Sequence, residues 1–536
     1  MVTRMLVRRN LYSDSVALMT LSQRLMALPG VEDAAAVMAT EMNQKLLRQA
    51  DLLDDQSARL DTGGPNDLLI VVRAESNEAA ETALHEAENS LKAAYRTDTS
   101  HHALQPRTLA QTLHQQTPPN LAVISVPGAY AALEAREALL AGLHVLLFSD
   151  NVSLEQEIAL KKLAVQRNLL VMGPDCGTAL LNGVGLGFAN AVPRGPIGIV
   201  SASGTGLQQV SSLIASYGSG VSQAIGTGGR DLSQAVGGST MLAGLEMLQQ
   251  DAQTRVIVLI SKPPAPSVAQ RVIEAASKGT KPTVVAFLGA DLAFLPSSHA
   301  LHAPLYAATT LAAAARSAMR LAGGQAPEPD VVLSHEAEAA IQAARAALHP
   351  EQRFLRGLFS GGTLCDEAMT LMSARLGPLY SNIPLRPAWE LENISISREH
   401  TAIDFGSDEF TRGRPHPMID PSLRLRRLEQ EARDPTTAVI LLDIVLGYGT
   451  HLDPAGAFAP AIERARASAA ENGRSLICIV SLCGTEQDIQ GFASQQEQFR
   501  QAGTLVFSEN AVAALVAAEI VAIRQAENTT PDRGHQ

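Results

Sequence analysis

The stretch PIGIVSASGTGLQQVSSLIASYG, residues 196–218, holds an apolar run, a glycine-rich turn and an amphipathic segment in direct succession. An apolar run of about five residues is typical of a strand buried in a parallel sheet. The turn SASGTG (201–206) can open a helix, because small residues permit a tight bend and serine is a favoured N-cap. Strand, turn and helix in this order predict one repeat of a parallel α/β sheet.

The same rhythm extends in both directions from this stretch. Comparable apolar runs lie at 121–126, 144–149, 169–173, 221–226, 255–260 and 282–287. A further series lies at 354–359, 400–405, 437–447, 475–482 and 504–509. Segments of helical periodicity, about 12–16 residues long, separate the runs. We therefore expect three α/β units with parallel sheets.

The first hundred residues have a different pattern, with elements in β-α-β…β-α order. This order predicts a ferredoxin-like α+β domain. The polar segment 97–120 and the stretch QAPEPD (325–330) have the composition of linkers. The expected domains are 1–110, 120–192, 193–325 and 350–526.

Charge and composition restrict the partners. The 536-residue chain has a net charge of −12, which disfavours nucleic acid and anionic membranes as ligands. The sequence has neither an apolar run long enough to span a bilayer nor a secretory leader behind MVTRMLVRRN. Its four cysteines form no CxxC pair, and the run LAVISVPGAY lacks a dinucleotide fingerprint. We expect a cytoplasmic protein that binds small molecules, without a metal site or nicotinamide cofactor.

Ligands of parallel sheets bind where strands end and helices begin. Amide groups and the partial positive charge of a helix N-terminus suit a phosphate or acyl group there, and Arg230 would add a fork of donors. The residues predicted to bind phosphate or acyl groups are Ser203, Gly204, Thr205, Gly206, Gly226, Thr227, Gly228, Gly229, Arg230, Gly361, Gly362, Thr363, Gly447 and Gly449. The alternative to ligand binding is a structural role, in which SASGTG is only a capped turn and Arg230 is a solvated side chain.

The turn MGPDCG (172–177) ends the run at 169–173 and is a candidate substrate loop. Its residues in question are Gly173, Pro174, Asp175 and Cys176. A reactive thiol needs a positive neighbour to lower its pKa. The sequence shows no such neighbour, so an inert Cys176 is favoured over a nucleophile.

Three side chains are candidates for catalysis. Asp443 lies within the very apolar run ILLDIVLG, His451 follows that run, and His416 lies in the proline-rich loop RGRPHPMIDP (412–421). A histidine can act as acid, base or donor to an oxyanion near neutral pH. The alternative for each histidine is a hydrogen bond to its own loop backbone.

These motifs together resemble a known family. From about residue 120 to 323 the chain resembles the α subunit of succinyl-CoA synthetase, through MGPDCG, GIVSASGTG and GTGG. From about residue 359 it resembles the carboxy-terminal domain of the β subunit, through SGGTLCDEA, AIDFG and VILLDIVLGYGTHLDP. With the N-terminal unit included, the chain is similar to the FdrA family over essentially its whole length. The resemblance implies a Rossmann-like CoA-binding-type domain at 120–192, followed by two flavodoxin-like domains.

The departures from succinyl-CoA synthetase are chemical. Those enzymes carry a phosphoryl group on a histidine in a G-H-A-G loop, whereas here the region 287–306 offers His299 and His302 without flanking glycines. The loop SKPPAP after the run 255–260 lacks the glutamate of the relatives, and no segment has the size of an ATP-grasp domain. ATP-driven thioester synthesis by this chain alone is therefore not expected.

The FdrA resemblance implies one subunit of an oligomeric, multi-subunit carbamoyltransferase of allantoin-type purine catabolism, acting on oxamate and carbamoyl phosphate. Carbamoyl phosphate is already an acyl phosphate, so a phosphate cradle and an oxyanion site suffice. Two alternatives stay open: an ADP-forming acyl-CoA synthetase, and a non-catalytic ligand sensor or scaffold. No cofactor is assigned, and CoA is the candidate that stays open.

Overall fold

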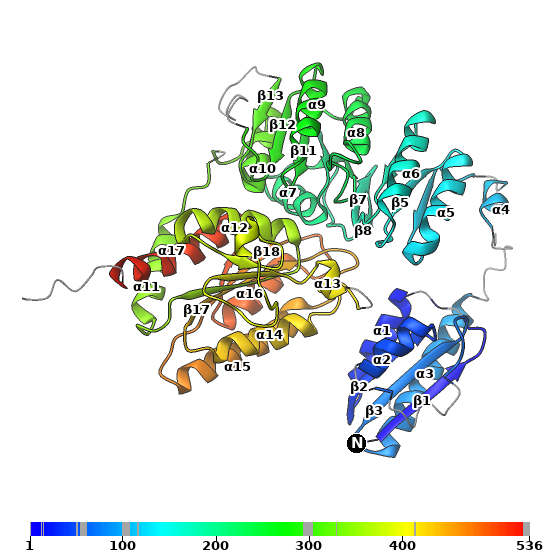
Figure 1. Ribbon diagram of the computed structural model, residues 1–536, viewed down its shortest axis with the longest axis horizontal. Helices are drawn as coiled ribbons and strands as arrows, with labels where there is room; N and C mark the ends of the chain where they lie inside the picture. Colours follow the sequence, from blue (N-terminus) through cyan, green and yellow to red (C-terminus); the bar gives the residue numbers. More distant parts are fainter. Residues whose placement is uncertain are drawn as a thin grey trace, which may run out of the picture. The chain divides into compact units, whose positions relative to one another are not determined.

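The computed structural model describes residues 2–528 apart from 12, 14, 50–51, 54–61, 99–107, 115–116, 293–303, 329 and 412–413. Two compact units divide the chain, one formed mainly by residues 1–115 and the other mainly by residues 116–536. Figure 1 shows the successive sheets along the chain, each with its own helices. Within the described residues, no helix has the length and apolarity that a membrane crossing requires.

The first unit has three strands in the spatial order β1-β3-β2, with both pairs antiparallel. Its elements are β1 (Val2–Arg8), α1 (Ser15–Met26), β2 (Val31–Met38), α2 (Glu41–Gln49), β3 (Leu68–Ala74), α3 (Asn77–Asp98) and the short α4 (Leu109–Leu113). The central strand β3 is apolar on both faces, because helices α1 and α3 pack on one face and α2 on the other. This arrangement confirms the ferredoxin-like α+β prediction.

The second unit begins with a three-stranded parallel sheet in the order β4-β5-β6. Its elements are β4 (Leu121–Ile124), α5 (Gly128–Leu140), β5 (His144–Leu147), α6 (Leu154–Gln166) and β6 (Val171–Met172). Helix α6 begins at a capping box, in which Ser153 and Gln156 satisfy each other's backbone amides. This sheet is the predicted Rossmann-like half.

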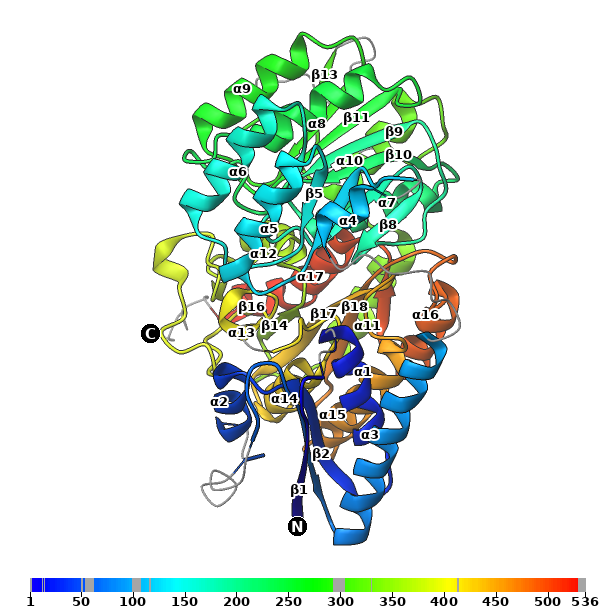
Figure 2. The same ribbon diagram turned by 90° about the vertical axis from the view of Figure 1, so that its right-hand side faces the viewer.

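A seven-stranded sheet follows, in the order β13-β12-β11-β9-β10-β7-β8. Its strands are β7 (Thr178–Leu181), β8 (Val184–Gly187), β9 (Ile197–Ser201), β10 (Val221–Gly226), β11 (Val256–Ser261), β12 (Thr283–Phe287) and β13 (Leu305–Ala307). Its helices are α7 (Gly204–Ser216), α8 (Ser239–Gln250), α9 (Pro266–Ser277) and α10 (Leu311–Leu321). Figure 2 shows β11, β9 and β10 side by side.

The hairpin β7–β8 is a difference from the sequence prediction. It lies inside the segment 120–192, yet β7 pairs antiparallel with β10 of the following sheet. The hairpin covers an edge of β10 that would otherwise expose unpaired backbone groups. The domain limits stay predictions.

The last sheet has six parallel strands in the order β15-β16-β14-β17-β18-β19. Its strands are β14 (Phe354–Phe359), β15 (Tyr380–Ser381), β16 (Thr401–Asp404), β17 (Thr437–Val445), β18 (Ile477–Cys483) and β19 (Leu505–Phe507). Its helices are α11 (His335–Ala347), α12 (Gly362–Leu376), α13 (Asp408–Thr411), α14 (Ser422–Arg433), α15 (Pro454–Glu471), α16 (Phe492–Gln501) and α17 (Asn510–Asn528). The two wholly parallel sheets, together with the seven-stranded sheet that is parallel apart from its edge hairpin β7–β8, confirm the predicted α/β class.

Helices α7 and α10 of the seven-stranded sheet pack against α12 and α17 of the six-stranded sheet (Figure 1). Their apolar faces form one continuous buried cluster. Buried Glu367 on α12 also accepts hydrogen bonds from the Leu311 amide at 2.7 Å and from Asn510 Nδ2 at 2.8 Å. One carboxylate thus joins α10, α12 and α17, so the two sheets keep a defined position relative to each other.

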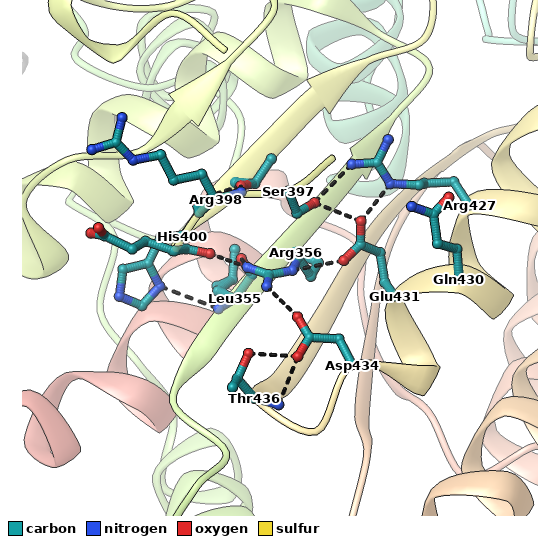
Figure 3. Close-up of polar contacts among 12 residues, drawn as sticks. Leu355, Arg356, Ser397, Arg398, His400, Arg427, Gln430, Glu431, Asp434 and Thr436 are labelled. Atoms are coloured by element: carbon teal, nitrogen blue, oxygen red, sulfur yellow. Dashed lines mark hydrogen bonds and ion pairs between the residues drawn. The ribbon is translucent and has the colours of Figure 1, made fainter. Parts of the chain in front are cut away.

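A separate polar network fixes the amino-terminal edge of the six-stranded sheet (Figure 3). Arg356 on β14 donates to Glu431 and Asp434 on the α14 side, each at 2.8 Å. Arg427 also pairs with Glu431, and Ser397 donates to the same carboxylate at 2.6 Å. Nearly buried charges need such complete pairing, so this network anchors α14 to the sheet.

Lys161 on α6 links the first sheet of the second unit to the next one. Its side chain is only 2% exposed, and Nζ lies 2.6 Å from Asp231 Oδ1 and 3.0 Å from Glu157 Oε1. Nζ also donates to the Thr227 carbonyl at 3.0 Å. The ammonium therefore neutralises two buried carboxylates at once.

Replacing Lys161 with methionine should lower the free energy of unfolding by about 3–5 kcal/mol, because it leaves buried carboxylates uncompensated. Lys162→Met is the matched control, since that neighbouring lysine is exposed and should change stability by less than about 0.5 kcal/mol. Urea unfolding followed by circular dichroism measures both. Equal midpoints for the two variants would contradict the proposed role of the network.

Candidate functional site

Two glycine-rich turns from different sheets meet in the second unit. SASGTG follows β9 and opens α7, and SGGT (360–363) follows β14 and opens α12. Ser203 caps α7 by accepting from the Gly206 amide at 2.8 Å, and its Oγ also donates to Thr363 Oγ1 at 2.6 Å. A Cβ on Gly361 would lie 2.7 Å from the methyl group of Thr205, so this approach requires glycine. The structure thus brings together two predicted turns that lie 160 residues apart.

The hydroxyl groups of this contact are buried, whereas the first residues of both helices reach solvent. Ser203 and Thr205 are 8% and 9% exposed and Thr363 is 3% exposed. Gly204 is exposed and Gly362 is partly exposed. Amides in a first helical turn have no partner within the helix. Two helix N-termini therefore converge on one accessible region, an arrangement that suits an anion.

Lys262 supplies a cation to this region. It directly follows β11, and its Nζ lies 2.9 Å from Asp366 on α12 and 3.0 Å from the position of a Cβ on Gly362. The side chain is 42% exposed. Burial lowers the pKa of Lys262, but the charges of Asp366 and Asp404 outweigh this effect and raise it. Lys262 is therefore charged at neutral pH and accessible.

Asp404 is the last residue of β16 and lies beside Lys262 at the start of α12. Its Oδ1 accepts from the Gly406 amide at 2.8 Å, and its Oδ2 lies 2.7 Å from the position of a Cβ on Gly362. The residue is 5% exposed. Burial raises the pKa of Asp404 to about 7, against the opposing charge of Lys262. This carboxyl group therefore changes its protonation near neutrality.

His416, a predicted catalytic residue, is part of the same neighbourhood. Its Nε2 and Asp404 Oδ1 each lie 3.1 Å from the position of a Cβ on Gly406. Its Nδ1 accepts from the Met418 amide at 3.3 Å. Burial, with a smaller contribution from Arg424, lowers the pKa of His416 to about 4. A neutral imidazole therefore borders the site at pH 7, with one nitrogen bound to its own loop.

Asp443, also predicted as catalytic, is 0% exposed on β17. Its two oxygens accept from the amides of Ser360 and Gly361 at 2.7 and 2.8 Å, and Arg424 donates to it at 2.8 Å. Burial raises the pKa of Asp443, while Arg424 opposes this shift. These contacts hold the SGGT turn in place, so the geometry fits a positioning role better than proton transfer.

His451 and the glycines at 447 and 449 lie in the loop after β17, at the same carboxyl edge of the six-stranded sheet as His416. The His451 amide donates to the Met418 carbonyl at 2.7 Å, and the Phe188 ring that Gly449 approaches lies 5.4 Å from the His416 ring. His451 Nδ1 accepts from the Asp453 amide at 3.1 Å, a bond within its own loop. Gly447 has φ +117° and leaves no room for a Cβ against Ala189. Gly449 similarly approaches Phe188, at 3.2 Å from a Cβ position. These residues pack the loop against the segment 185–190.

The turns at 173–176 and 226–230 pack against each other. Cβ atoms on Gly226 and Gly228 would overlap Thr178 and Pro174 respectively, and Thr227 is 0% exposed. Burial raises the pKa of the Cys176 thiol to about 12, which matches the inert alternative. Gly173 is likewise enclosed, with a Cβ position 3.1 Å from the Leu147 side chain.

Arg230 and Asp175 flank these turns. The Arg230 Nε lies 2.9 Å from buried Glu157, and its Nη2 donates to the Val152 carbonyl at 2.8 Å. Gly229, by contrast, is exposed, with open space around a Cβ position. Burial raises the pKa of Asp175 to about 6, with further contributions from Asp408 and Asp150. Arg230 is therefore bound within the protein and does not offer its full set of donors to a ligand.

Sequence reasoning missed Lys262, Asp366 and Asp404. The three residues lie within the sequence motifs SKPPAP, SGGTLCDEA and AIDFG respectively. Lys262 and Asp404 also stand at the carboxyl ends of buried strands, which was the available signal. His299 and His302 lie outside the described residues.

Three family models match the chain: "CoA-ligase" over residues 358–520, "CoA binding domain" over 194–289, and "AllF, heavy metal-associated domain" over 1–106. The match to the CoA binding domain covers β9–β12. The CoA-binding-type domain expected at 120–192 from the sequence stays a prediction. Residues 1–106 contain no cysteine. Among the residues that the structure describes, no group of three or more His, Cys, Asp or Glu side chains is placed to hold a metal ion.

Several known proteins are similar to this chain. The uncharacterized protein YahF of Escherichia coli K12 is 45% identical over 521 residues, covering 97% of this chain and 99% of YahF. The ADP-forming succinate–CoA ligase subunit alpha of Aquifex aeolicus is 31% identical over 154 residues, 28% of this chain and 49% of that protein. The ADP-forming sulfoacetate-CoA ligase subunit SqwL of an Acholeplasma species is 29% identical over 162 residues, 28% of this chain and 53% of that protein.

The matched CoA binding and CoA-ligase domains make this chain an acyl-CoA synthetase-like protein. The identity to YahF extends over nearly the whole of both chains. The two matched domains also stand in the order expected for fused α-like and β-like parts. The chain therefore belongs to the FdrA family of succinyl-CoA synthetase-like proteins.

Proposed function

We propose that this chain is a cytoplasmic subunit of an acyl- or carbamoyl-transferring enzyme, specifically an oxamate carbamoyltransferase of allantoin-type purine catabolism. The observation that carries the proposal is the convergence of the N-termini of α7 and α12 beside the accessible ammonium of Lys262. Two helix N-termini and one cation match the charge of a phosphate group. An acyl phosphate bound here would have its carbonyl next to amide donors.

The chemistry of carbamoyl phosphate fits these residues. Its carbonyl carbon is already activated, so transfer needs stabilisation of the developing oxyanion and of the leaving phosphate. Gly204, which is exposed, and Gly362, which is partly exposed, have no Cβ beside their amides. The hydroxyl groups of Ser203 and Thr363 lie directly behind them. No phosphorylated histidine is needed in this reaction.

The alternative function is an ADP-forming acyl-CoA synthetase, which the CoA binding and CoA-ligase matches favour. Against it, part of the turn at 226–230 is packed within the protein: Thr227 is fully buried, and Arg230, although its side chain is 49% exposed, is paired with buried Glu157. We therefore propose no CoA contact at this turn. Relatives named as ligase subunits support the expectation of partner subunits.

A paired assay tests the proposed function. The full-length chain is purified together with the subunits that accompany it in its native cells. One reaction contains carbamoyl phosphate and oxamate, and the other contains ATP, CoA and succinate. We expect phosphate release only in the first. Turnover only in the second would establish the synthetase, and a saturable thermal shift without turnover in either would favour the non-catalytic ligand sensor.

Lys262→Met should raise the KM for carbamoyl phosphate about 10- to 100-fold. A hydrogen bond to a charged group contributes about 1.5–3 kcal/mol, and about 1.4 kcal/mol corresponds to a factor of ten. Lys278→Met is the control, because Lys278 is an exposed residue at the end of α9, and it should leave KM within about twofold. Initial rates over a range of carbamoyl phosphate concentrations measure both. Equal KM values in the two variants would exclude Lys262 from the phosphate site.

A further inference from the structure

We propose that Asp404 is a catalytic residue that carries the proton exchanged with the nitrogen of the carbamoyl acceptor. This role deepens the proposed function and rests on it. Asp404 was not among the residues expected from sequence, and its position at the end of β16 places it beside both Lys262 and the first turn of α12.

The two carboxylate oxygens of Asp404 have different surroundings. Oδ1 accepts from the Gly406 amide at 2.8 Å, which fixes the orientation of the group. Oδ2 lies against the first residue of α12: a Cβ on Gly362 would lie 2.7 Å from Oδ2 and 3.0 Å from Lys262 Nζ, so glycine at this position lets the carboxyl oxygen and the ammonium group approach the helix start. The carboxyl group is thus held by one oxygen and presents the other at the region where the anion binds.

The surrounding charges come from every element packed on Asp404. Those groups are Lys262 after β11, Cys365 and Asp366 on α12, Asp443 on β17, Arg424 on α14, and His416 in the loop that follows α13. Burial and the two neighbouring carboxylates raise the pKa of Asp404, and Lys262 limits that rise to about 7. A group with a pKa near the working pH exchanges protons efficiently in both directions.

The neighbouring candidates are less suited to this task. Both oxygens of Asp443 accept bonds from the SGGT turn and Arg424, and its side chain is fully buried. His416 has a pKa of about 4, lowered by burial, so its imidazole stays neutral across the physiological range. Asp404 therefore combines an oxygen at the first turn of α12 with a pKa of about 7.

The proton transfer completes a balanced reaction. In the synthetic direction, the acceptor's amide nitrogen attacks the carbamoyl carbon and a C–N bond forms. The C–O bond to phosphate breaks, its electron pair leaves with phosphate, and Asp404 takes the proton lost by nitrogen. In the reverse direction, a phosphate oxygen attacks the carbon, the C–N bond breaks, and protonated Asp404 returns the proton to nitrogen. An amide nitrogen is a weak nucleophile, so a base at this point contributes strongly.

Asp404→Asn in the complete complex tests this role, because asparagine keeps an oxygen that can accept from the Gly406 amide. We expect kcat to fall about 100-fold or more in both directions, with the KM for carbamoyl phosphate within threefold. In the wild type, synthesis should slow as pH falls through about 7, since the base becomes protonated. Phosphorolysis should slow as pH rises through the same range. These two decreases are the synthetic limb and the phosphorolytic limb of the pH–rate profile, and both should disappear in Asp404→Asn.

Two further variants keep the test decisive. Lys262→Met removes the charge that lowers the pKa of Asp404, so the synthetic limb should move to higher pH. Asp434→Asn changes an aspartate paired with Arg356 at the opposite edge of the same sheet, and its kcat and pH limbs should match the wild type. Retained kcat and retained limbs in Asp404→Asn would overturn this proposal alone. A limb that does not move in Lys262→Met would also overturn it, even if Asp404→Asn failed to fold. Absence of carbamoyl transfer by the wild-type complex would overturn the proposed function and this role with it.

Discussion

The contact between the first turns of α7 and α12 is the constraint on which the candidate site depends. Ser203 and Thr363 can reach 2.6 Å only because Gly361 has no side chain where Thr205 lies. The continuous apolar cluster beneath both helices holds this approach, and buried Glu367 adds polar ties to α10 and α17. Two helix N-termini that face each other carry like partial charges. Their proximity is therefore unfavourable by itself. Helix packing must enforce it, and an anion bound in the same region would stabilise it.

Buried charges in this protein fall into two groups with different surroundings. Arg356 with Glu431, and Arg424 with Asp443, are nearly closed to solvent and mutually neutralised. They hold α14 and the SGGT turn against the six-stranded sheet. Lys262 and Asp404 differ, because the lysine is 42% exposed and one oxygen of the Asp404 carboxyl group lies against the first residue of α12. Complete pairing stabilises a fold, whereas partial pairing leaves a charge available for a ligand.

The sequence allowed the fold class and two turns of the candidate site to be predicted. Apolar runs and glycine turns located the strands of the parallel sheets and the turns at 201–206 and 360–363, because both signals are local. In the predicted turns at 226–230 and 447–449, the structure places Gly226, Gly228, Gly447 and Gly449 against neighbouring segments. A glycine needed for close backbone contact has the same sequence appearance as a glycine needed for a ligand. The edge hairpin β7–β8 was missed for a related reason, since its partner β10 lies about forty residues away in the chain.

The sequence by itself determined the α/β architecture, the order of the units and the membership of a family with CoA-ligase-type domains. Periodicity and turn composition suffice for these features because neighbouring residues set them. Only the tertiary structure decided which turns meet and that Lys262, Asp404 and His416 lie beside them. Those facts depend on how strand ends from two separate sheets are placed by helix packing. The protonation of Asp404 depends on burial and on a lysine more than 140 residues away along the chain, so no local pattern encodes it.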